Sequence, residues 1–595
     1  MKNIEEAVRE RTLIFDGAMG TLLMGYNLSV EDYEGHKNCY DLLNLTRPDI
    51  VKKVHASYFE VGCDIVETNS FSANPLTFSR WGIARRAYTV AERSAEIAKK
   101  VAKEFSTPRW PRFVSGAIGP GYGLPTLLQA DFDTLYNSYL VQARALIYGG
   151  VDIIQVETSQ DILQIKAALI SVFDAMEKCN RKIPVMVQAT VEKNGKMLPG
   201  TSIEALIATT TPFDILALGI NCGTGPDSIY EIVKIFSEKS PFLISVLPNA
   251  GLPKLVKGKL LYSLGPEKFA DHLSFLVKKY GVHFVGGCCG TTPLYIKAVY
   301  KRIKSFKGFK KPVEKNPSFG ASTFRAQNYV VNPRPLIINE NINLNNPKVF
   351  RETLLKESSE TMFSKPLDQQ DKNVHILGIT LACTGKNEEK NLVKTVKIIN
   401  RYLKIPLCIG LTDPVSLEAA LKCYGGRALI NSINLKDGGK TAQKIIRMAK
   451  RYGAAVIGLT VDENGAATTA KEKVEVAGRI IALVEKEGLS RKNLMINTFT
   501  FTLGSRNSEC FNDTVETFNA IKEIKKKFPD VLTALKISSC SSGFTSRLEL
   551  ILNTIFLYHA VDAGLDAAIL HTEKVLPMHL IEDEEKKFAE DIVFK

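Results

Sequence analysis

The chain has 595 residues, of which 45% are hydrophobic and 24% are charged, values typical of a soluble globular protein. A chain of this length is too long for one ordinary core, so two or more domains are expected. The formal net charge of +14 comes from lysines spread along the chain. Because no nucleic-acid-binding motif accompanies them, we predict no nucleic-acid partner.

The cellular setting is predicted from the N-terminus and the cysteines. Acidic residues appear early and no apolar core follows them, which argues against a signal peptide. No apolar run approaches the length of a membrane span, so no membrane partner is expected. Eleven cysteines, an odd and modest number, indicate free thiols with a metal or catalytic cluster among them. We therefore expect a cytoplasmic protein.

The first half of the chain alternates short apolar runs with longer amphipathic segments. Continuous apolar runs separated by helices are typical of buried parallel strands, and eight such units in about 300 residues predict a (β/α)₈ barrel over residues 1–305. The runs are Leu13–Phe15, Asp64–Thr68, Phe113–Ile118, Asp152–Glu157, Val185–Ala189, Ile215–Ile220, Phe242–Val246 and His283–Gly287.

Three cysteines follow two of these runs in glycine-rich sequence. Cys222 follows the sixth run, and Cys288 and Cys289 follow the eighth. The carboxyl ends of the strands meet at the mouth of such a barrel, where its active site is built. Three thiolates without a fourth protein ligand are typical of zinc with an open position, which a substrate sulfur would fill as thiolate. The alternative is a packed, glycine-lined strand end that holds no metal.

A second domain is predicted after a change of texture. Residues 306–334 are basic and interrupted by proline and glycine, which predicts a linker. Eight further apolar runs then predict a second (β/α)₈ barrel over residues 335–595. The fold class is therefore α/β, with two tandem TIM barrels. The runs are Leu336–Ile338, Val374–Leu377, Pro406–Ile409, Ala428–Ile430, Ala455–Leu459, Leu494–Ile496, Leu532–Leu535 and Ala567–Leu570.

Motifs in the first barrel carry a family resemblance. They are Asp16-Gly-Ala-Met-Gly-Thr, Glu67-Thr-Asn-Ser-Phe, Glu157-Thr, Gly-Ile-Asn-Cys222-Gly and Gly-Gly-Cys288-Cys289-Gly. Their order and spacing resemble the zinc-dependent homocysteine S-methyltransferase family, which includes the N-terminal module of cobalamin-dependent methionine synthases.

The resemblance implies a set of site residues. Cys222, Cys288 and Cys289 would ligate Zn²⁺ as the catalytic centre, and the homocysteine sulfur would be the incoming ligand. Asp16 and Glu157, with Asn221 beside Cys222, would hold the substrate. The backbone N–H groups of a glycine-rich turn suit its carboxylate; this turn consists of Gly17, Ala18 and Met19.

The second barrel is similar to the pterin-binding module of the same enzymes in scaffold, but its site residues differ. The family has Gly-Glu-Arg-x-Asn-x-Thr-Gly where this chain has the stretch Asn339–Asn346. Family aspartates are replaced by Gly410 and Asn497, and a family asparagine by Ser539. A site built for buried polar groups discriminates strongly by them, so we predict that the folate site is lost; any cofactor-binding residues here stay unknown.

The expected function is methyl transfer to homocysteine thiolate, giving methionine. No cobalamin-binding motif of the Asp-x-His-x-x-Gly kind is present, so the expected donor is methylcobalamin on a separate corrinoid protein. Two alternatives remain. The chain could be a methionine synthase fragment that still uses methyltetrahydrofolate in the second barrel, or a non-catalytic scaffold that docks a corrinoid protein.

Overall fold

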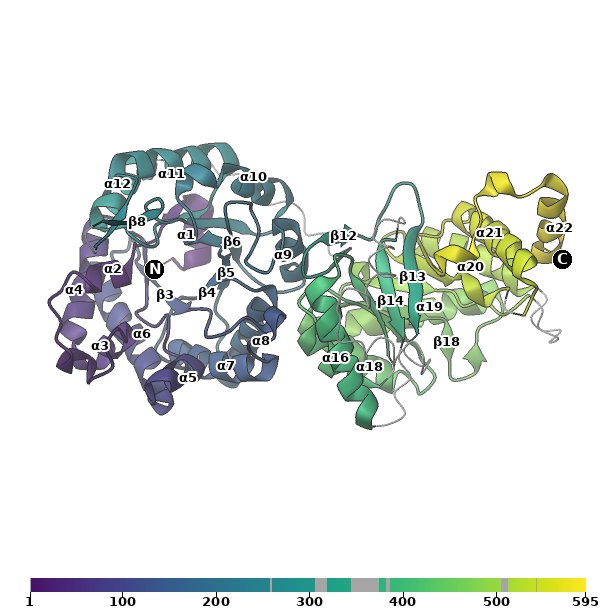
Figure 1. Ribbon diagram of the computed structural model, residues 1–595, viewed down its shortest axis with the longest axis horizontal. Coiled ribbons are helices and arrows are strands. Elements are labelled where there is room, and N and C mark those ends of the chain that lie inside the picture. Colours follow the sequence, from purple (N-terminus) through teal and green to yellow (C-terminus); the bar gives the residue numbers. More distant parts are fainter. Residues whose placement is uncertain are drawn as a thin grey trace. The chain divides into compact units, whose positions relative to one another are not determined.

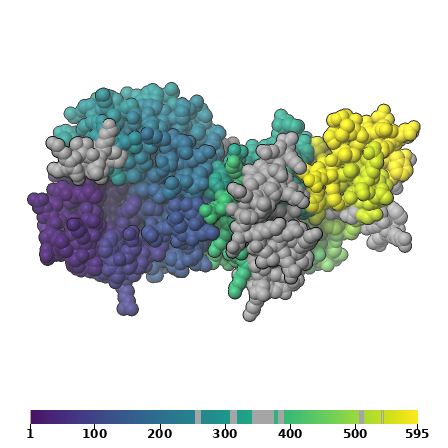
Figure 2. Space-filling view, in the orientation of Figure 1, coloured from purple at the N-terminus to yellow at the C-terminus, as the bar shows by residue number. Residues whose placement is uncertain are grey.

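A computed structural model describes residues 2–256, 259–304, 306, 318–343, 374–380, 386–411, 413–503, 512–541 and 543–594, which carry the sequence colours in Figure 1 and Figure 2. The chain forms two compact units, one built chiefly from residues 1–315 and the other from residues 316–595. Within the described residues no helix combines the length and apolarity needed to cross a bilayer.

Eight parallel strands form the barrel of the first unit, in the order β1-β10-β7-β6-β5-β4-β3-β2. The ring closes between the first and last strands, where Phe15 bridges Ile65 and the Asp16 amide donates to the Ile65 carbonyl at 2.9 Å. Each apolar run of the sequence is one of these strands: β1 (Leu13–Ile14), β2 (Ile65–Glu67), β3 (Phe113–Ile118), β4 (Ile153–Ser159), β5 (Val185–Ala189), β6 (Ala217–Asn221), β7 (Leu243–Leu247) and β10 (Phe284–Val285).

Helices surround this barrel, as the ring of coils in Figure 1 shows. In α6 the buried positions include Val90, Ile97 and Val101, the helical spacing seen in the sequence. The helices are α1 (Ile4–Glu10), α2 (Met19–Leu23), α3 (Leu43–Thr46), α4 (Pro48–Glu60), α5 (Pro75–Phe78), α6 (Ala87–Phe105), α7 (Phe132–Tyr148), α8 (Ile162–Lys178), α9 (Ile203–Thr210), α10 (Tyr230–Lys239), α11 (Pro266–Tyr280) and α12 (Pro293–Ile303).

The amino ends of the strands in the first barrel are closed by α1. Ile4, Ala7 and Val8 of this helix pack against inward-facing strand residues such as Phe113 and Met186. A capping box at Asn3 and Glu6 starts the helix, because each side chain accepts from the other residue's backbone N–H. Apolar side chains therefore close the amino end of the barrel, and the polar site residues lie at the carboxyl ends of the strands.

The second unit is also a closed parallel barrel, so two tandem TIM barrels are confirmed. Its strands are β13 (Leu336–Asn343), β14 (Ile376–Thr380), β15 (Leu407–Gly410), β16 (Leu429–Ile433), β17 (Ala455–Leu459), β20 (Leu494–Asn497), β21 (Leu532–Lys536) and β22 (Ala567–Leu570). Its helices are α16 (Lys386–Tyr402), α17 (Pro414–Cys423), α18 (Lys440–Tyr452), α19 (Ala470–Lys486), α20 (Asp513–Lys527), α21 (Ser546–Asp562) and α22 (Asp583–Phe594).

Part of the segment expected to be a linker is folded. The strands β11 (Phe319–Ala321) and β12 (Ala326–Asn328) pair as an antiparallel hairpin that belongs to the second unit. Ala321 bonds the backbone of Arg427 in both directions, and Tyr329 joins the interior core of the barrel. The expectation of a linker over 306–334 is therefore wrong for 319–328, because this hairpin closes the amino end of the second barrel as α1 closes the first.

Candidate functional site

The three cysteines of the glycine-rich turns meet at the mouth of the first barrel. The Sγ atoms of Cys222, Cys288 and Cys289 all lie within 4.8 Å of one another, and the pair Cys222–Cys289 is separated by 3.9 Å. A search of the described cysteine, histidine, aspartate and glutamate side chains for groups of three or more that could hold a metal ion finds this group of cysteines. The structure therefore brings together the three thiols that the sequence predicts as zinc ligands.

Neighbouring strand ends hold the cysteines in place through their backbones. The Cys222 amide donates to Leu247 at 3.1 Å, and the Cys288 amide donates to Pro248 at 2.8 Å. Cys222 itself has a φ of 58°, in the left-handed region that few non-glycine residues adopt. Such a conformation persists only where the surrounding structure enforces it, and it is concentrated at functional sites.

Glycine is required near these cysteines because there is no room for a larger side chain. A Cβ on Gly219 would overlap the Ser245 carbonyl of the next strand, and one on Gly287 would overlap the Thr291 side chain. The glycines of the two motifs therefore let adjacent strands and the turn after β10 approach closely enough to bring the sulfurs together.

The three thiols influence one another's protonation. Hydrogen bonds from Cys288 and Cys289 lower the pKa of Cys222 to about 3, helped by the Gly223 amide and the Asn249 side chain. The same interactions raise the pKa of Cys288 well above its usual range and that of Cys289 to about 12. Three sulfurs that interact this strongly are suited to bind one cation together, because the thiolate is the form of cysteine that ligates metals.

Three carboxyl groups lie at the same end of the barrel. Asp16 and Glu157 are buried, and Glu67 lies between them in sequence on β2. The Glu67 amide donates to the Asp16 carboxylate at 3.1 Å, and Gln155 Nε2 donates to Glu67 Oε1 at 2.6 Å. Burial raises the pKa of Glu67 to about 7, and burial plus the Glu67 charge raise the pKa values of the other two well above their usual range.

Asn221 connects the carboxyl cluster to the cysteine turn. Its Nδ2 donates to Glu157 Oε2 and to Thr158 Oγ1, both at 2.9 Å, while its Oδ1 accepts from the Thr158 amide at 2.8 Å. Thr158 has a φ of 53°, so this bond supports a second strained residue at the barrel mouth. The Glu157 carboxylate is thereby held by Asn221, the residue that precedes Cys222.

The turn expected to bind a substrate carboxylate is only partly available. The Ala18 amide donates to the Thr291 carbonyl at 3.1 Å, so this N–H is already used, contrary to expectation. Gly17 packs so closely on Thr291 that a Cβ there would meet its hydroxyl at 2.6 Å. Met19 begins α2, and the first amides of a helix have no partner within the helix.

Two further residues at the cysteines were given no role by sequence reasoning. Asn249 follows β7, between the two cysteine-bearing turns, and its buried Oδ1 has no hydrogen-bond partner among the residues that the structure describes. Its position just after a strand was the available signal. Tyr262 lies near Cys289 and has its pKa raised to about 12 by burial and by the thiolate charges. No pattern in the sequence marked it.

The donor set fits a zinc ion. Thiolates are preferred ligands of zinc, and three of them with one unused position match its open, catalytic arrangement. The unpartnered Oδ1 of Asn249 beside Cys222 is the kind of buried oxygen that a cation satisfies.

At the mouth of the second barrel, side chains at the positions aligned with the pterin site already form contacts within the protein. Glu340 forms an ion pair with Lys536 at 2.9 Å, and Asn497 Oδ1 accepts from the Phe499 amide at 3.0 Å. Gly410, where the resemblance would place an aspartate, is the last residue of β15. Leu344–Asn346 and the Ser539 side chain lie outside the described residues.

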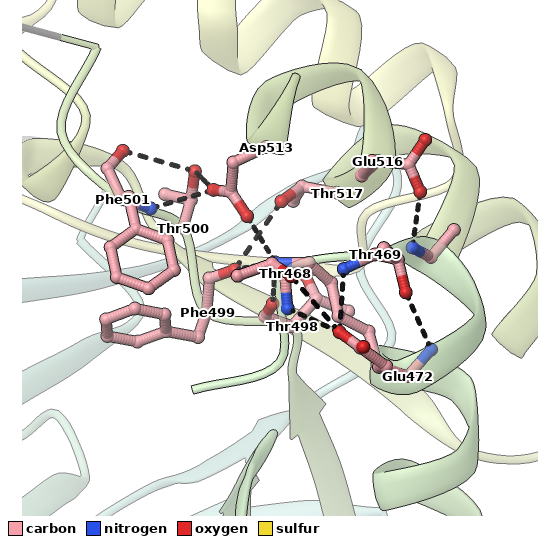
Figure 3. A network of polar contacts seen from close by, with 12 residues as sticks. Thr468, Thr469, Glu472, Thr498, Phe499, Thr500, Phe501, Asp513, Glu516 and Thr517 are labelled. Atoms are coloured by element: carbon pink, nitrogen blue, oxygen red, sulfur yellow. Dashed lines mark hydrogen bonds and ion pairs between the residues drawn. The ribbon is translucent and has the colours of Figure 1, made fainter. Parts of the chain in front are cut away.

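The loop after β20 in this barrel is fixed by a buried polar network (Figure 3). Asp513 accepts from the Thr500 hydroxyl at 2.9 Å and from the Phe501 amide at 2.8 Å. Lys473 of α19 forms an ion pair with Asp513 at 2.8 Å and donates to the carbonyl of Phe499 at 2.7 Å. The network defines the shape of this part of the mouth.

Comparisons with known proteins agree with this architecture. Residues 13–303 match the homocysteine S-methyltransferase family, and residues 339–571 match the pterin binding enzyme family. The methionine synthases of Mycobacterium tuberculosis and Mycobacterium leprae are each 36% identical over 99% of this chain. The chain spans 50% of the length of each of these relatives.

Two solved structures resemble single parts of the chain. The homocysteine methyltransferase MmuM from Escherichia coli, in its metallated form, matches 49% of this chain and 96% of its own, at 20% identity and a TM-score of 0.41. A dihydropteroate synthase from Xanthomonas albilineans, in complex with 7,8-dihydropteroate, matches 42% of this chain and 90% of its own, at 13% identity and a TM-score of 0.32. Likeness at this level does not by itself establish a shared activity.

The order of the two matched domains is the decisive finding, because the long alignment with the methionine synthases runs through both of them. The chain therefore combines a domain of the homocysteine S-methyltransferase family with a following domain of the pterin binding enzyme family, and nearly its whole length is similar to one half of a methionine synthase.

Proposed function

We propose that this chain is a zinc-dependent enzyme that transfers a methyl group to the thiolate of homocysteine and releases methionine. The donor is a methylcobalamin carried by a corrinoid protein separate from these 595 residues. The observation that carries the proposal is the cluster of three Sγ atoms within 4.8 Å at one barrel mouth, next to buried carboxyl groups.

Different residues of the site would bind the thiol and the ammonium group of the substrate. Zinc held by Cys222, Cys288 and Cys289 would supply the positive charge that keeps a substrate thiol, with a free pKa near ~8.5, ionised at neutral pH. Asp16 and Glu157 would pair with the substrate ammonium group. Binding that cation offsets the cost of burying the carboxylates, since an opposite charge nearby favours their ionised form.

The methyl transfer itself requires little acid–base chemistry from the protein. The sulfur lone pair forms the new bond to the methyl carbon, and the bonding pair leaves with the cobalt, so no proton needs to reach the leaving group. The chain's own contribution is orientation, because the amino end is fixed by Asp16 and Glu157 and the sulfur is fixed by the cysteine cluster. Holding reactants in this way is a large source of catalysis.

The proposal is tested by supplying candidate donors to the full chain and measuring methionine. We expect methionine from homocysteine and methylcobalamin, in proportion to the zinc content of the protein. Zinc-free protein with full activity would contradict the zinc role, and activity with methyltetrahydrofolate alone, without added corrinoid, would favour the alternative in which the second barrel supplies the donor.

The second barrel is proposed to have lost methyltetrahydrofolate binding. Removing one partner of a hydrogen bond to a charged group costs about 1.5–3 kcal/mol, and positions 410 and 497 each lack the family's aspartate. Glu340 is already paired with Lys536. We therefore expect isothermal titration of the full chain with methyltetrahydrofolate to show no micromolar binding.

That titration has an internal control. Homocysteine added to the same zinc-loaded sample must bind, which establishes that the protein is folded and active in binding. A micromolar dissociation constant for methyltetrahydrofolate would contradict the loss of this site.

Glu67 provides a pH-dependent prediction for the first barrel. Its pKa is raised to about 7 by burial, so it is roughly half protonated at pH 7. Arrival of the homocysteine ammonium group lowers this pKa, so binding should release about half a proton from Glu67, in addition to the protons released by the thiol and by Asp16 and Glu157, whose pKa values are also raised. In Glu67→Gln the release at pH 7 should fall by that fraction, and the difference from wild type should shrink as the pH rises toward ~8.5.

The proton count is measured by isothermal titration in buffers of different ionisation enthalpy. The exposed Glu60→Gln is the matched control and should release as many protons as wild type. Equal proton release by wild type and Glu67→Gln at pH 7 would show that Glu67 does not titrate with binding.

A further inference from the structure

A hairpin that interrupts the first barrel places a tyrosine beside the cysteine cluster. Strands β8 (Pro253–Val256) and β9 (Lys259–Tyr262) pair between β7 and α11, with Pro253 opposite Tyr262. The base of this hairpin is tied to the cysteine turn, because the Ala250 amide donates to the Cys289 carbonyl at 3.0 Å and the Leu264 amide donates to the Ala250 carbonyl at 3.1 Å.

The aromatic ring of Tyr262 rests on the residue next to the second cysteine. Three of its ring atoms occupy the space where a side chain of Gly290 would begin, and Gly290 has a φ of 81°. This glycine therefore serves two needs: a left-handed turn after Cys289, and room for the ring. Any larger residue at position 290 would push the ring away from the turn.

Tyr262 lies close enough to Cys289 for burial, the thiolate charge and a side-chain hydrogen bond to raise the pKa of the tyrosine. The first cysteine, Cys222, has donors of a different kind, the Gly223 amide and the Asn249 side chain. Polar groups from outside the cysteine cluster thus lie at two of the three sulfurs. Three thiolates and a substrate thiolate around one Zn²⁺ would carry net negative charge, which such donors reduce.

We propose that Tyr262 is a positioning residue of the metal centre, whose hydroxyl donates to Sγ of Cys289 while its ring on Gly290 fixes the turn that carries both adjacent cysteines. This inference rests on the zinc site of the proposed function and adds a residue that acts through a ligand. Groups that orient and hydrogen-bond metal ligands are worth 10- to 100-fold in metal affinity. By reducing the negative charge on Cys289, the hydroxyl also favours binding of a fourth sulfur, that of the substrate.

The test compares three variants of the full chain. Tyr262→Phe removes the hydroxyl and keeps the ring, and Gly290→Ala displaces the ring. Tyr295→Phe is the matched control, because the Tyr295 hydroxyl donates to the Leu264 carbonyl at 2.6 Å and so supports the same hairpin base away from the sulfurs. Zinc affinity is measured by competition with a chromophoric chelator, and the Co²⁺-substituted proteins are compared by their thiolate-to-cobalt charge-transfer bands.

We expect Tyr262→Phe to bind zinc 10- to 100-fold more weakly and to shift the charge-transfer band, Gly290→Ala to change both in the same direction, and Tyr295→Phe to match wild type. Unchanged affinity and an unchanged band in Tyr262→Phe would overturn the proposal, as would an equal loss in Tyr295→Phe, which would assign the effect to the hairpin. Failure of the wild-type protein to bind zinc would overturn the proposed function itself. This result is distinct from failure of the Tyr262 proposal because it is seen in the wild-type protein, without any substitution.

Discussion

Replacing Cys288 with alanine is expected to remove zinc and methyl transfer together. A tetrahedral zinc site in a protein is worth about 10–16 kcal/mol, so one of four ligands contributes roughly 3–4 kcal/mol, a factor of about 100 to 1,000 in affinity. Cys288 lies within 4.8 Å of both other sulfurs, so its loss leaves two thiolates to hold the ion. Zinc per chain after gel filtration and methionine formation should fall in parallel.

Cys39→Ala is the control for this experiment. Cys39 is a buried cysteine of the same barrel that lies outside the cluster, so its variant should retain zinc and activity. Normal zinc content with lost activity in Cys288→Ala would assign Cys288 to the reaction instead of to the metal. Normal activity in Cys288→Ala would contradict the proposed centre.

The barrels and the cysteine cluster could be predicted because both follow from strand ends. A buried parallel strand appears in the sequence as a continuous apolar run, and in a closed barrel the residues after every run share one mouth. Cys222 and Cys289 are 67 positions apart, yet their placement after the sixth and eighth runs was enough to bring them together. Glycines 219 and 287 point to the same turns because a side chain there has no room.

Features that depend on an insertion or on a distant backbone contact could not be predicted. Tyr262 approaches Cys289 only because a hairpin folds back between β7 and α11. The Ala18 amide is used by Thr291, more than 270 positions away, and no local pattern shows which carbonyl will accept it. The hairpin at 319–328 resembles a linker in sequence because its strands are three residues long and lie among prolines and glycines.

Glu67 was recognised as part of a motif, but its role could not be assigned from sequence. Its pKa depends on how deeply the carboxyl is buried and on which charges surround it, and both are properties of the folded barrel. Lys473 and Asp513 are a similar case. Charged residues on helices are usually solvated, and these two lie 40 positions apart, so only the fold reveals a buried ion pair.

Replacing Lys473 with methionine is expected to destabilise the second barrel by about 3–5 kcal/mol, the cost of leaving one partner of a buried ion pair alone. The side chains of Lys473 and Asp513 are 0% and 2% exposed. Asp513 would keep its bonds from Thr500 and Phe501 but lose its cation, and the Thr498 and Phe499 carbonyls would lose the Lys473 ammonium as a donor. The exposed Lys471→Met on the same helix is the matched control.

The two tryptophans of the chain make the effect measurable by barrel. Trp81 and Trp110 both lie in the first unit, so their fluorescence follows that barrel, while far-ultraviolet circular dichroism follows both. In urea, Lys473→Met should move part of the dichroism transition to lower concentration and leave the fluorescence transition in place, and Lys471→Met should move neither.

The double variant Lys473→Met, Asp513→Leu separates the charge from the hydrogen bonds. Replacing both members of a buried ion pair by apolar residues is often neutral or stabilising. Here, however, the pair also holds the backbone of the β20 loop, because Asp513 accepts the Phe501 amide and Lys473 donates to the Thr498 and Phe499 carbonyls. We therefore expect the double variant to recover only part of the loss, since buried backbone groups stay unpaired at about 1–3 kcal/mol each. Full recovery would mean that the network stabilises the loop by charge alone.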